Sequence, residues 1–387
     1  MSNRIGLAIV TYTINYGTYL QAFATQYAIR KLGYNTEIIN IDSVIKDVSK
    51  ARKKYFLKQL LNFAEVKSYF GIVGSIVQKK INPAYKTYYG QREAAFAKFH
   101  DDYFCIGPVC NSWKGLSEHC KEFDSVIVGS DQLWRPANIA GNFYTLNFVP
   151  DEINTIAYAT SFGLKEIRHN QREAARAFLS RINYLSCREE SGAKIIKELT
   201  ERDAKVVCDP TILVSKNDWE NMIPKERIIK EDYILVYFVG NNKEHRKYVR
   251  ELSRKTSKKI IGVLHGAGYV KGDEKNVDEY PASVGPFDFL NLIKFADCVC
   301  TDSFHGCVFS ILFEKEFLAF KRFSDTDKMS TNTRVTNLLA RFGLANRLVT
   351  DYTRLNYETI DYRIVKGLLE IFRQESEQYL LDALNKR

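Results

Sequence analysis

The feature that most constrains this fold is an alternation of short apolar runs with segments whose apolar residues recur at helical spacing. The apolar runs cover 5–12, 36–41, 125–128, 155–160, 233–239, 259–264, 298–301 and 316–320. Helical spacing covers 17–32, 171–183, 243–256, 286–295 and 304–313. Strands that alternate with helices form parallel sheets, because a parallel connection needs a crossover. We therefore predict an α/β fold of two Rossmann-like domains that face a cleft.

The domain boundaries are predicted from where this alternation stops and starts again. We expect an N-terminal Rossmann-like domain at 1–210, a linker at 211–232 and a C-terminal Rossmann-like domain at 233–350. A helical segment at 351–387 closes the chain. Ligands of open α/β sheets bind at the carboxyl ends of the strands, so the cleft suits a transferase. We assign the acceptor to the N-terminal domain and the donor to the C-terminal domain.

Positive charge is concentrated in a helical insertion at about 46–110 of the first domain. Of the net charge of +10, most arises between residues 46 and 100, where 12 Lys/Arg face 3 acidic residues. Apolar residues are interleaved at helical spacing, which predicts amphipathic helices. Two interpretations stay open, namely peripheral contact with an anionic membrane face or lipid phosphate, and an ordinary solvated surface. Nucleic acid is not an expected partner, because no other part of the chain resembles a nucleic-acid module.

Several function classes have no motif in this chain. No apolar run reaches the roughly 18 residues that cross a bilayer. The first residues lack a small-residue cleavage site, so we expect a cytoplasmic protein, or one at the inner face of the membrane. The eight cysteines form no Cys-x-x-Cys pair, and there is no His-Glu-x-x-His, Walker loop or Gly-x-Gly-x-x-Gly. We therefore expect no metal and no cofactor.

The segment Asp302-Ser303-Phe304-His305-Gly306 joins an apolar strand to an apolar helix. Such a corner presents free backbone N–H groups and the positive end of a helix dipole, which favour phosphate or carboxylate groups. His305 adds an imidazole that titrates near neutral pH, so anion binding and proton transfer can share one site. The alternative is a histidine that only caps the helix.

Five motifs, taken together and in this order, resemble those of the polysaccharide pyruvyl transferase family. They are Asn15-Tyr16-Gly17 with Gln21, Gly129-Ser130-Asp131-Gln132-Leu133-Trp134, Ser186-Cys187-Arg188-Glu189, Asp209-Pro210, and Thr301 to Gly306. The resemblance implies a fold similar to the GT-B glycosyltransferases. It also implies transfer of pyruvyl from phosphoenolpyruvate to two hydroxyls of a saccharide, with ketal formation and release of phosphate. The family's usual setting, together with the basic insertion, suggests an acceptor carried on a polyprenyl diphosphate, in capsule or exopolysaccharide synthesis.

The resemblance also implies that His305 and Arg188 handle the donor. Many family members have an arginine where this chain has Ser303, so either another cation supplies that charge or the donor differs. Donor binding is expected at the corner residues Ser303 and Gly306, and at arginines and lysines predicted near element ends, which are Arg188, Lys321, Arg322 and Arg334. His305 is the candidate acid and Asp131 the candidate base for a sugar hydroxyl. A capping aspartate and an ion pair between Arg188 and Glu189 or Glu190 are the alternatives.

Acceptor binding is expected at the N-terminal domain. The candidate residues are Asn15, Gly17, Gln21, Gln132, Trp134 and Arg135. Trp134 is expected to stack on a sugar ring, with interdomain packing as the alternative. For the turn at Asn15 to Gly17, a plain turn is the alternative.

Two rival functions remain at the level of sequence. One is a GT-B-type glycosyltransferase that uses a nucleotide sugar, because fold alone does not separate the two activities. The other is a non-catalytic protein that binds glycans or lipid-linked intermediates. Such a protein would keep the basic insertion and tolerate loss of His305.

Overall fold

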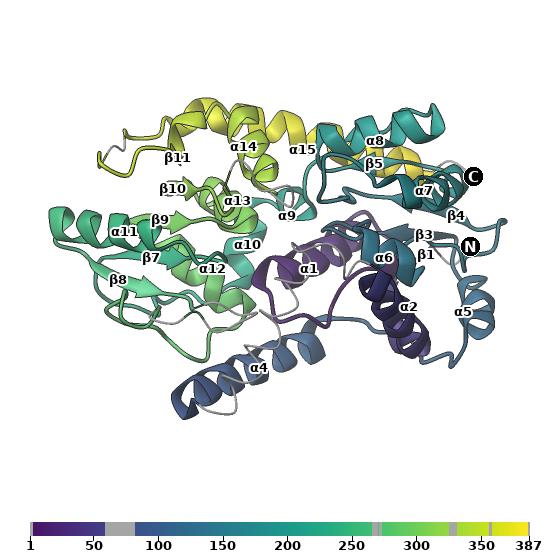
Figure 1. The fold of residues 1–387 in the computed structure, drawn as a ribbon, viewed down its shortest axis with the longest axis horizontal. Coiled ribbons are helices and arrows are strands. Elements are labelled where there is room, and N and C mark those ends of the chain that lie inside the picture. The colour runs from purple at the N-terminus through teal and green to yellow at the C-terminus, as the bar shows by residue number, and fades with distance from the viewer. Residues whose placement is uncertain are drawn as a thin grey trace.

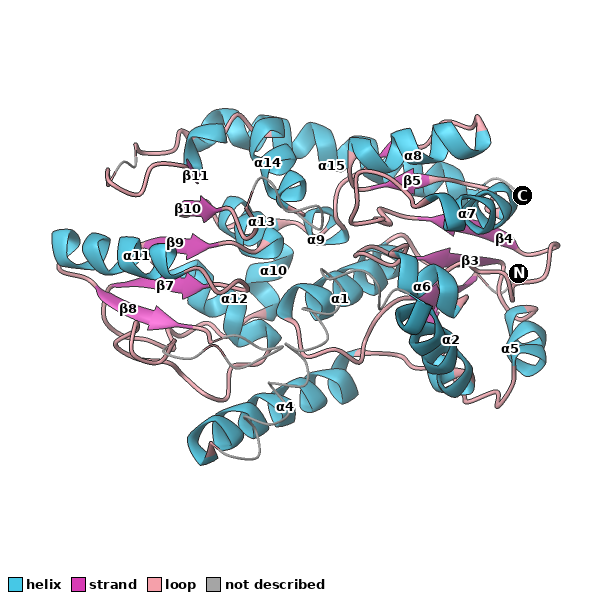
Figure 2. Cartoon of the chain, viewed as in Figure 1, coloured by secondary structure: helices cyan, strands magenta, loops and turns pink. Residues whose placement is uncertain are grey.

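Two parallel sheets at opposite ends of the molecule organise the fold (Figure 1). The structure is a computed structural model that describes residues 3–58, 82–264, 270, 273–324, 331–355 and 358–385. Helices cover the sheets and fill the space between them (Figure 2). The predicted α/β class, with two units built on parallel sheets, is confirmed.

The N-terminal sheet is fully parallel, in the order β2-β1-β3-β4. Its strands are β1 (Arg4–Ala8), β2 (Asn35–Ile38), β3 (Ser125–Val128) and β4 (Asn154–Ala157). A short parallel pair, β5 (Ser186–Cys187) and β6 (Lys205–Val206), extends this half. Central strand β3 is buried along its whole length, as expected of a parallel strand covered on both faces.

The C-terminal sheet is also parallel, in the order β11-β10-β9-β7-β8. Its strands are β7 (Tyr233–Tyr237), β8 (Lys259–Gly262), β9 (Cys298–Thr301), β10 (Glu316–Phe320) and β11 (Leu348–Val349). The jump from β8 past β7 to β9 reverses the direction of strand addition. Such a switch point opens a crevice at the carboxyl ends of the strands.

The helices connect the strands as crossovers, as the alternation predicted. In the first half they are α1 (Tyr16–Lys31), η1 (Ile41–Ser43), α2 (Ile45–Lys58), α4 (Pro83–Tyr103), α5 (Trp113–Cys120), α6 (Pro136–Gly141), α7 (His169–Arg181) and α8 (Glu190–Thr200). In the second half they are α9 (Pro210–Leu213), α10 (Lys216–Met222), α11 (Lys243–Thr256), α12 (Pro286–Phe295), α13 (Phe304–Leu312), α14 (Asn332–Arg341), η2 (Ala345–Arg347) and α15 (Tyr362–Asn385).

The segment expected to be a linker is part of the packed interior. It forms α9 and α10, and its Trp219 is fully buried. The Trp219 ring lies 5.7 Å from that of Phe23 in α1 and 5.3 Å from that of Phe309 in α13. One continuous apolar core therefore joins the two halves through this segment.

Two helices tie the halves together. Helix α15 runs back to the N-terminal sheet, where Asn154 donates a hydrogen bond to the Ala383 carbonyl at 3.0 Å (Figure 1). Helix α4 belongs to the basic insertion, yet its buried Arg92 donates to the Leu264 carbonyl beyond β8 at 2.7 Å. The insertion is thus helical at both flanks, in α2 and α4, and its central part at 59–81 lies outside the described residues. Among the described residues, no helix has the length and apolar character to span a bilayer.

The buried His245 of α11 predicts a pH dependence of stability. Its ring is enclosed by Phe238, Phe320 and Tyr352, and neither ring nitrogen has a hydrogen-bond partner among the described residues. Burial, followed by the charge of Arg246, lowers the pKa of His245 to about 4. The unfolded chain therefore binds the proton first, and stability is lost as the pH falls from about 6.5 to about 4.

This loss is expected to reach about 3 kcal/mol and to disappear in His245→Phe. Chemical denaturation at neutral pH and near pH 4.5 measures it. The exposed His169 provides the matched control, His169→Gln, which should keep the wild-type pH profile. An acid-induced loss of the same size in His245→Phe and in the wild type would refute the assignment.

Candidate functional site

The candidate site lies where the carboxyl end of the N-terminal sheet meets the start of α13. The loop after β3 supplies Asp131, and the loop after β5 supplies Arg188 and Glu189. Helix α13 supplies His305 from the other half. Six ionisable side chains gather here, which are Asp131, Arg188, Glu189, Asp209, His305 and Arg334. We call them the interdomain cluster.

Arg188 is the buried centre of the interdomain cluster. Its Nη1 donates a hydrogen bond to Asp209 Oδ2 at 2.7 Å, and its guanidinium carbon lies 4.6 Å from the centre of the Phe304 ring. The Nε atom is 3.8 Å from Glu189 Oε2, which is too long for a hydrogen bond. Nε and Nη2 of Arg188 therefore have no acceptor among the described residues. The predicted ion pair with an acid is present, but its main partner is Asp209.

His305 faces Asp209 on one side and Gly17 on the other. Its Nε2 lies 3.4 Å from Asp209 Oδ2, and its side chain is 9% exposed. Burial alone would raise the pKa of Asp209, but the positive charges of His305 and Arg188 outweigh it and hold that pKa far below its usual range. Asp209 is thus an ionised carboxylate that faces the His305 ring.

Asp131 is held in an ionised form by three cations. Burial opposes ionisation of this carboxyl, but the charges of Arg188, His305 and Arg334 outweigh it and lower the pKa of Asp131. The Thr18 hydroxyl donates to Oδ2 at 2.9 Å. The backbone of Asp131 is in the left-handed region, with φ of 78°. Residues other than glycine adopt this conformation at an energetic cost. The turn therefore fixes a carboxylate toward the cations.

Arg334 reaches the cluster from α14. With its amide oxygen turned toward the guanidinium, Gln132 accepts from Nη1 at 2.8 Å and from Nη2 at 2.6 Å. Burial and the neighbouring Arg188 charge lower the pKa of Arg334 to about 10. Two guanidinium groups from different halves of the chain therefore lie near each other. This proximity is unfavourable unless carboxylates or a bound anion compensate it.

In the corner at 302–306, Asp302 and Ser303 hold the turn that carries His305. Asp302 is buried and accepts from the backbone N–H groups of Val239 at 2.6 Å and Gly240 at 2.8 Å, so it fixes the loop after β7. Ser303 is the N-cap of α13 and accepts from the Gly306 N–H at 3.4 Å. Asp302 and Ser303 thus hold the first turn of α13, and with it His305, in place.

Gly17 is required by the approach of His305. A Cβ atom at position 17 would lie 2.0 Å from Nδ1 of the imidazole and under 3 Å from two of its carbons. We expect Gly17→Ala to displace the ring and to lower kcat at least about tenfold, because a small misplacement of a catalytic group is costly. Near- and far-ultraviolet circular dichroism should stay that of the wild type.

Gly90→Ala is the matched control for this prediction. Gly90 is also helical, in α4, and has no atom within 4 Å of a Cβ position. Alanine there should keep full activity and raise the helix stability slightly. Equal activity of Gly17→Ala and Gly90→Ala would show that the ring position at His305 does not matter for turnover.

The other predicted donor residues have fewer contacts with the interdomain cluster in the described part of the chain. Arg322 follows β10, is exposed, and is close enough to Arg334 to affect its pKa. Lys321 is half-buried directly after β10. Gly306 lies in the first turn of α13 against the Thr301 side chain. The polar residues His265 and Ser330 lie outside the described residues.

Two acceptor predictions are wrong for packing reasons. Trp134 is fully buried, donates from Nε1 to the Tyr144 carbonyl at 3.0 Å and packs on Phe162 and Phe178, so no sugar can stack on it. Gln21 is also fully buried and donates to the Thr18 carbonyl within α1 at 2.9 Å.

The remaining acceptor candidates keep a place near the interdomain cluster. Asn15 caps α1 by accepting from the Thr18 N–H at 3.1 Å, which is the plain-turn alternative. Arg135 is half-buried at the start of α6. Gln132 contacts Arg334, as described above.

Sequence reasoning gave no role to Asp209, which pairs with both Arg188 and His305. Asp209 stood in a quoted motif before Pro210, and it also caps α9 by accepting from the Thr211 N–H at 3.1 Å. The sequence signal was therefore that of a helix cap. Asp209 also contacts Arg188 and His305, which lie 21 and 96 positions away in the sequence. No local sequence pattern reveals such contacts.

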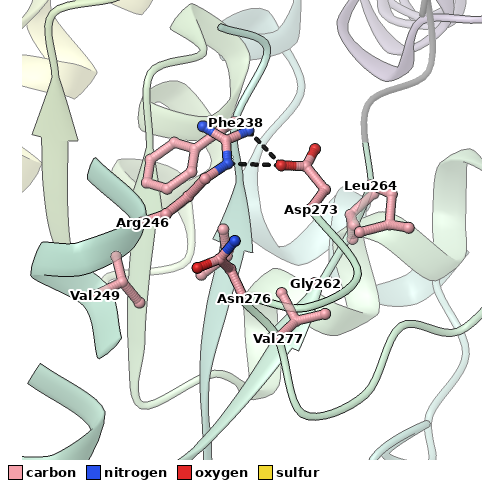
Figure 3. Close-up of a pocket in the computed structure, with 10 residues that line it drawn as sticks. Phe238, Arg246, Val249, Gly262, Leu264, Asp273, Asn276 and Val277 are labelled. Carbon is pink, nitrogen blue, oxygen red and sulfur yellow. Dashed lines mark hydrogen bonds and ion pairs between the residues drawn. The ribbon is translucent and has the colours of Figure 1, made fainter. Parts of the chain in front are cut away.

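A separate pocket lies in the C-terminal half, at the ends of β7 and β8 (Figure 3). Its charged groups are Arg246 and Asp273, which bind each other through Nε at 2.6 Å and Nη2 at 2.5 Å. The rest of its lining is mostly apolar. Because the charges here already satisfy each other, the interdomain cluster is the better candidate for binding a small anion.

Comparison with known proteins identifies the family. The family described as polysaccharide pyruvyl transferase matches residues 15–322. A search of curated proteins found no match. Similar solved structures include UDP-GlcNAc 2-epimerase from Methanocaldococcus jannaschii, at 14% identity and TM-score 0.46, covering 99% of this chain and 93% of that one.

Two further solved structures resemble the whole chain. One is UDP-GlcNAc 2-epimerase from Neisseria meningitidis bound to UDP-GlcNAc, at 10% identity and TM-score 0.49, covering 99% of this chain and 100% of that one. The other is the glycosyltransferase SnogD from Streptomyces nogalater, at 11% identity and TM-score 0.42, covering 97% and 95%. Five of the six cluster residues lie within the matched range, and Arg334 lies beyond it. This chain therefore belongs to the polysaccharide pyruvyl transferase family.

Proposed function

We propose that this protein transfers pyruvyl from phosphoenolpyruvate to two hydroxyls of a saccharide, forming a cyclic ketal and releasing phosphate. The observation that carries the proposal is the unfilled hydrogen-bonding capacity of the interdomain cluster. Nε and Nη2 of Arg188 are buried and have no hydrogen-bond partner among the described residues. Buried donors are normally satisfied, so a bound acceptor group belongs here.

Phosphoenolpyruvate fits these donors because it carries a carboxylate and a phosphate. The planar edge of Arg188 suits a bidentate carboxylate or phosphate, and Arg334 offers a second guanidinium beside it. Many family members have an arginine where this chain has Ser303. Arg334, which reaches the cluster from α14, supplies a cation in its place.

The reaction needs one proton at carbon and two new C–O bonds. Protonation of the methylene carbon of phosphoenolpyruvate gives an oxocarbenium-like centre, which the first sugar hydroxyl attacks. The C–O bond to phosphate then breaks, and the second hydroxyl attacks the new cationic centre. The methyl group and the released phosphate take up the protons that the two hydroxyls lose. Atoms and charges balance without an oxidant or a further reactant.

The cluster contains groups for both proton transfers. His305, which faces the Asp209 carboxylate, is the acid that protonates the methylene carbon. Asp131 is a carboxylate fixed in the first half of the chain, and it accepts the proton of the sugar hydroxyl. The acceptor therefore binds on the side of β1 and β3, and the donor on the side of α13 and α14.

The acceptor in this proposal is a saccharide carried on a polyprenyl diphosphate. The basic surface of α2, with Lys46, Lys50, Lys53, Lys54 and Lys58, supports peripheral contact with an anionic membrane face.

The test is incubation of the protein with phosphoenolpyruvate and a panel of saccharide acceptors, with detection of phosphate and of the product mass. The proposal expects a product that gains one pyruvyl ketal, with one phosphate released for each. Parallel incubations with nucleotide sugars test the rival activity. Glycosyl transfer from a nucleotide sugar, without any reaction of phosphoenolpyruvate, would refute the proposal.

A further inference from the structure

A second polar cluster lies beside the interdomain cluster, on the N-terminal half. It consists of Tyr12 in the loop after β1, Arg52 on α2 and Tyr144 after α6, and we call it the phenol–arginine cluster. Both Nη atoms of Arg52 lie 3.4 Å from the Tyr12 hydroxyl. The Tyr144 hydroxyl lies 3.4 Å from the same oxygen. The family resemblance gave none of these three residues a role.

Arg52 is a cation held where α2 packs against α6. Helix α6 packs against α2, and a Cβ atom on Gly141 would lie 3.4 Å from Arg52 Nε. That nitrogen is buried and has no hydrogen-bond partner among the described residues. Among the residues that the structure describes, no carboxylate lies within ion-pair distance of Arg52. A half-buried guanidinium with two long bonds to one hydroxyl has several donors left for an anion.

The ring of Tyr12 completes a surface that suits a sugar. Tyr12 is 45% exposed, which is unusual for a large aromatic residue beside a buried sheet end. An exposed ring beside a guanidinium offers a stacking face for a sugar and a fork for a phosphate. Here Tyr12 has the exposed position that was expected of the buried Trp134.

The phenol–arginine cluster adjoins the candidate base. Trp134, three residues after Asp131, donates from Nε1 to the Tyr144 carbonyl at 3.0 Å. Burial is the main cause that raises the pKa of the Tyr144 hydroxyl, and the Asp131 carboxylate also contributes. Tyr144 is thus near both Arg52 and Asp131. A ligand that places a hydroxyl at Asp131 would extend toward Arg52.

We propose that the phenol–arginine cluster binds a phosphate group of the acceptor, with Tyr12 against the attached sugar. This inference rests on the proposed function for the identity of the acceptor, but not for the existence of the phosphate subsite. It names two specificity-determining residues, Arg52 and Tyr12. The chemistry recognised is a sugar with a phosphate or diphosphate, whether that group is attached to a lipid or is free.

The experiment measures binding by calorimetry to the full-length protein saturated with phosphoenolpyruvate. The probes are inorganic pyrophosphate, glucose 1-phosphate and glucose. Arg52→Gln should weaken binding of both phosphate probes about 10- to 100-fold and leave phosphoenolpyruvate binding unchanged. Tyr12→Ala should weaken glucose 1-phosphate and spare pyrophosphate. Lys54→Gln is the matched control, because Lys54 is an exposed cation on the same helix.

Two results would overturn the subsite. One is unchanged binding of pyrophosphate and glucose 1-phosphate in Arg52→Gln that folds like the wild type. The other is an equal loss in Lys54→Gln, which would show a diffuse charge effect. A melting curve of each variant checks the fold, and Arg52→Lys provides a second variant that keeps the charge without the fork.

Two further experiments identify the source of the phosphate and test the subsite independently of the proposed function. Geranyl diphosphate that binds more tightly than pyrophosphate supports the subsite with a lipid-linked acceptor, and equal binding supports it with a free sugar phosphate. Titrations without phosphoenolpyruvate, in the wild type and in Arg188→Lys, show whether the phosphate probes use Arg188. If phosphoenolpyruvate does not bind to the protein, but Arg52→Gln still weakens binding of the phosphate probes, the subsite is upheld and the proposed donor is rejected.

Discussion

His305→Gln is expected to lower the rate of phosphate release from phosphoenolpyruvate about 10²- to 10⁴-fold in the presence of acceptor. The amide of glutamine cannot deliver a proton to the methylene carbon, and general acid catalysis contributes about this factor. The KM for phosphoenolpyruvate should change less than kcat, because Arg188 and Arg334 still bind the anion. Steady-state kinetics with a phosphate assay measure both quantities.

The control for this variant is His100→Gln, which changes a histidine of α4 in contact with the exposed Asp101. It should keep the wild-type kcat and melting temperature. The pH profile provides a readout beyond activity, since the limb due to the protonated acid should vanish in His305→Gln. A His305→Gln protein that folds normally and releases phosphate at the wild-type rate would remove the acid role of this residue.

Arg188→Met is expected to lower the free energy of unfolding by about 3–5 kcal/mol and to abolish binding of phosphoenolpyruvate. Removal of the guanidinium takes a buried cation away from the buried carboxylates of Asp209 and Glu189. Such an uncompensated buried charge is costly. Denaturant unfolding gives the stability, and calorimetry with phosphoenolpyruvate gives the affinity.

Arg181→Met is the matched control, because Arg181 forms a surface ion pair with the exposed Asp151. Arg181 also donates to the Asn147 and Val149 carbonyls at 3.0 Å, and its loss should still destabilise the protein less than Arg188→Met. Arg188→Lys keeps the charge and loses the planar fork, so stability should recover more than donor affinity. Full affinity for phosphoenolpyruvate in a folded Arg188→Met protein would contradict the assignment of Arg188 to the donor.

Much of the fold could be predicted from the sequence, because period and propensity agree along most of the chain. The apolar runs at 125–128, 298–301 and 316–320 coincide with β3, β9 and β10. Helical spacing at 243–256 and 286–295 coincides with α11 and α12. Buried parallel strands read as continuous apolar runs, so their existence is visible locally.

Strand ends and short elements were predicted less well. The run 5–12 continues as apolar sequence beyond the end of β1 at Ala8, because the loop after the strand packs inside the protein. The two-residue strand β11 has no periodic signal. The charged segment 211–232 resembles a linker by composition, although Trp219 anchors it in the core.

The candidate site was predicted in its residue types but not in its pairing. His305, Arg188 and Asp131 meet as expected for residues at strand and helix ends. The pairing of Arg188 and His305 with Asp209 depends on three separate segments, and sequence spacing carries no information on it. Trp134 shows the same limit, because nothing in the local sequence indicates that Phe162 and Phe178 would bury it.

The most direct test of the central claim is a calorimetric titration of the full-length protein with phosphoenolpyruvate and, separately, with UDP-GlcNAc. The account predicts that phosphoenolpyruvate binds with one site per chain, and that Arg188→Met abolishes this binding while Arg181→Met does not. Binding of UDP-GlcNAc alone, or binding of phosphoenolpyruvate that is indifferent to Arg188, would contradict it.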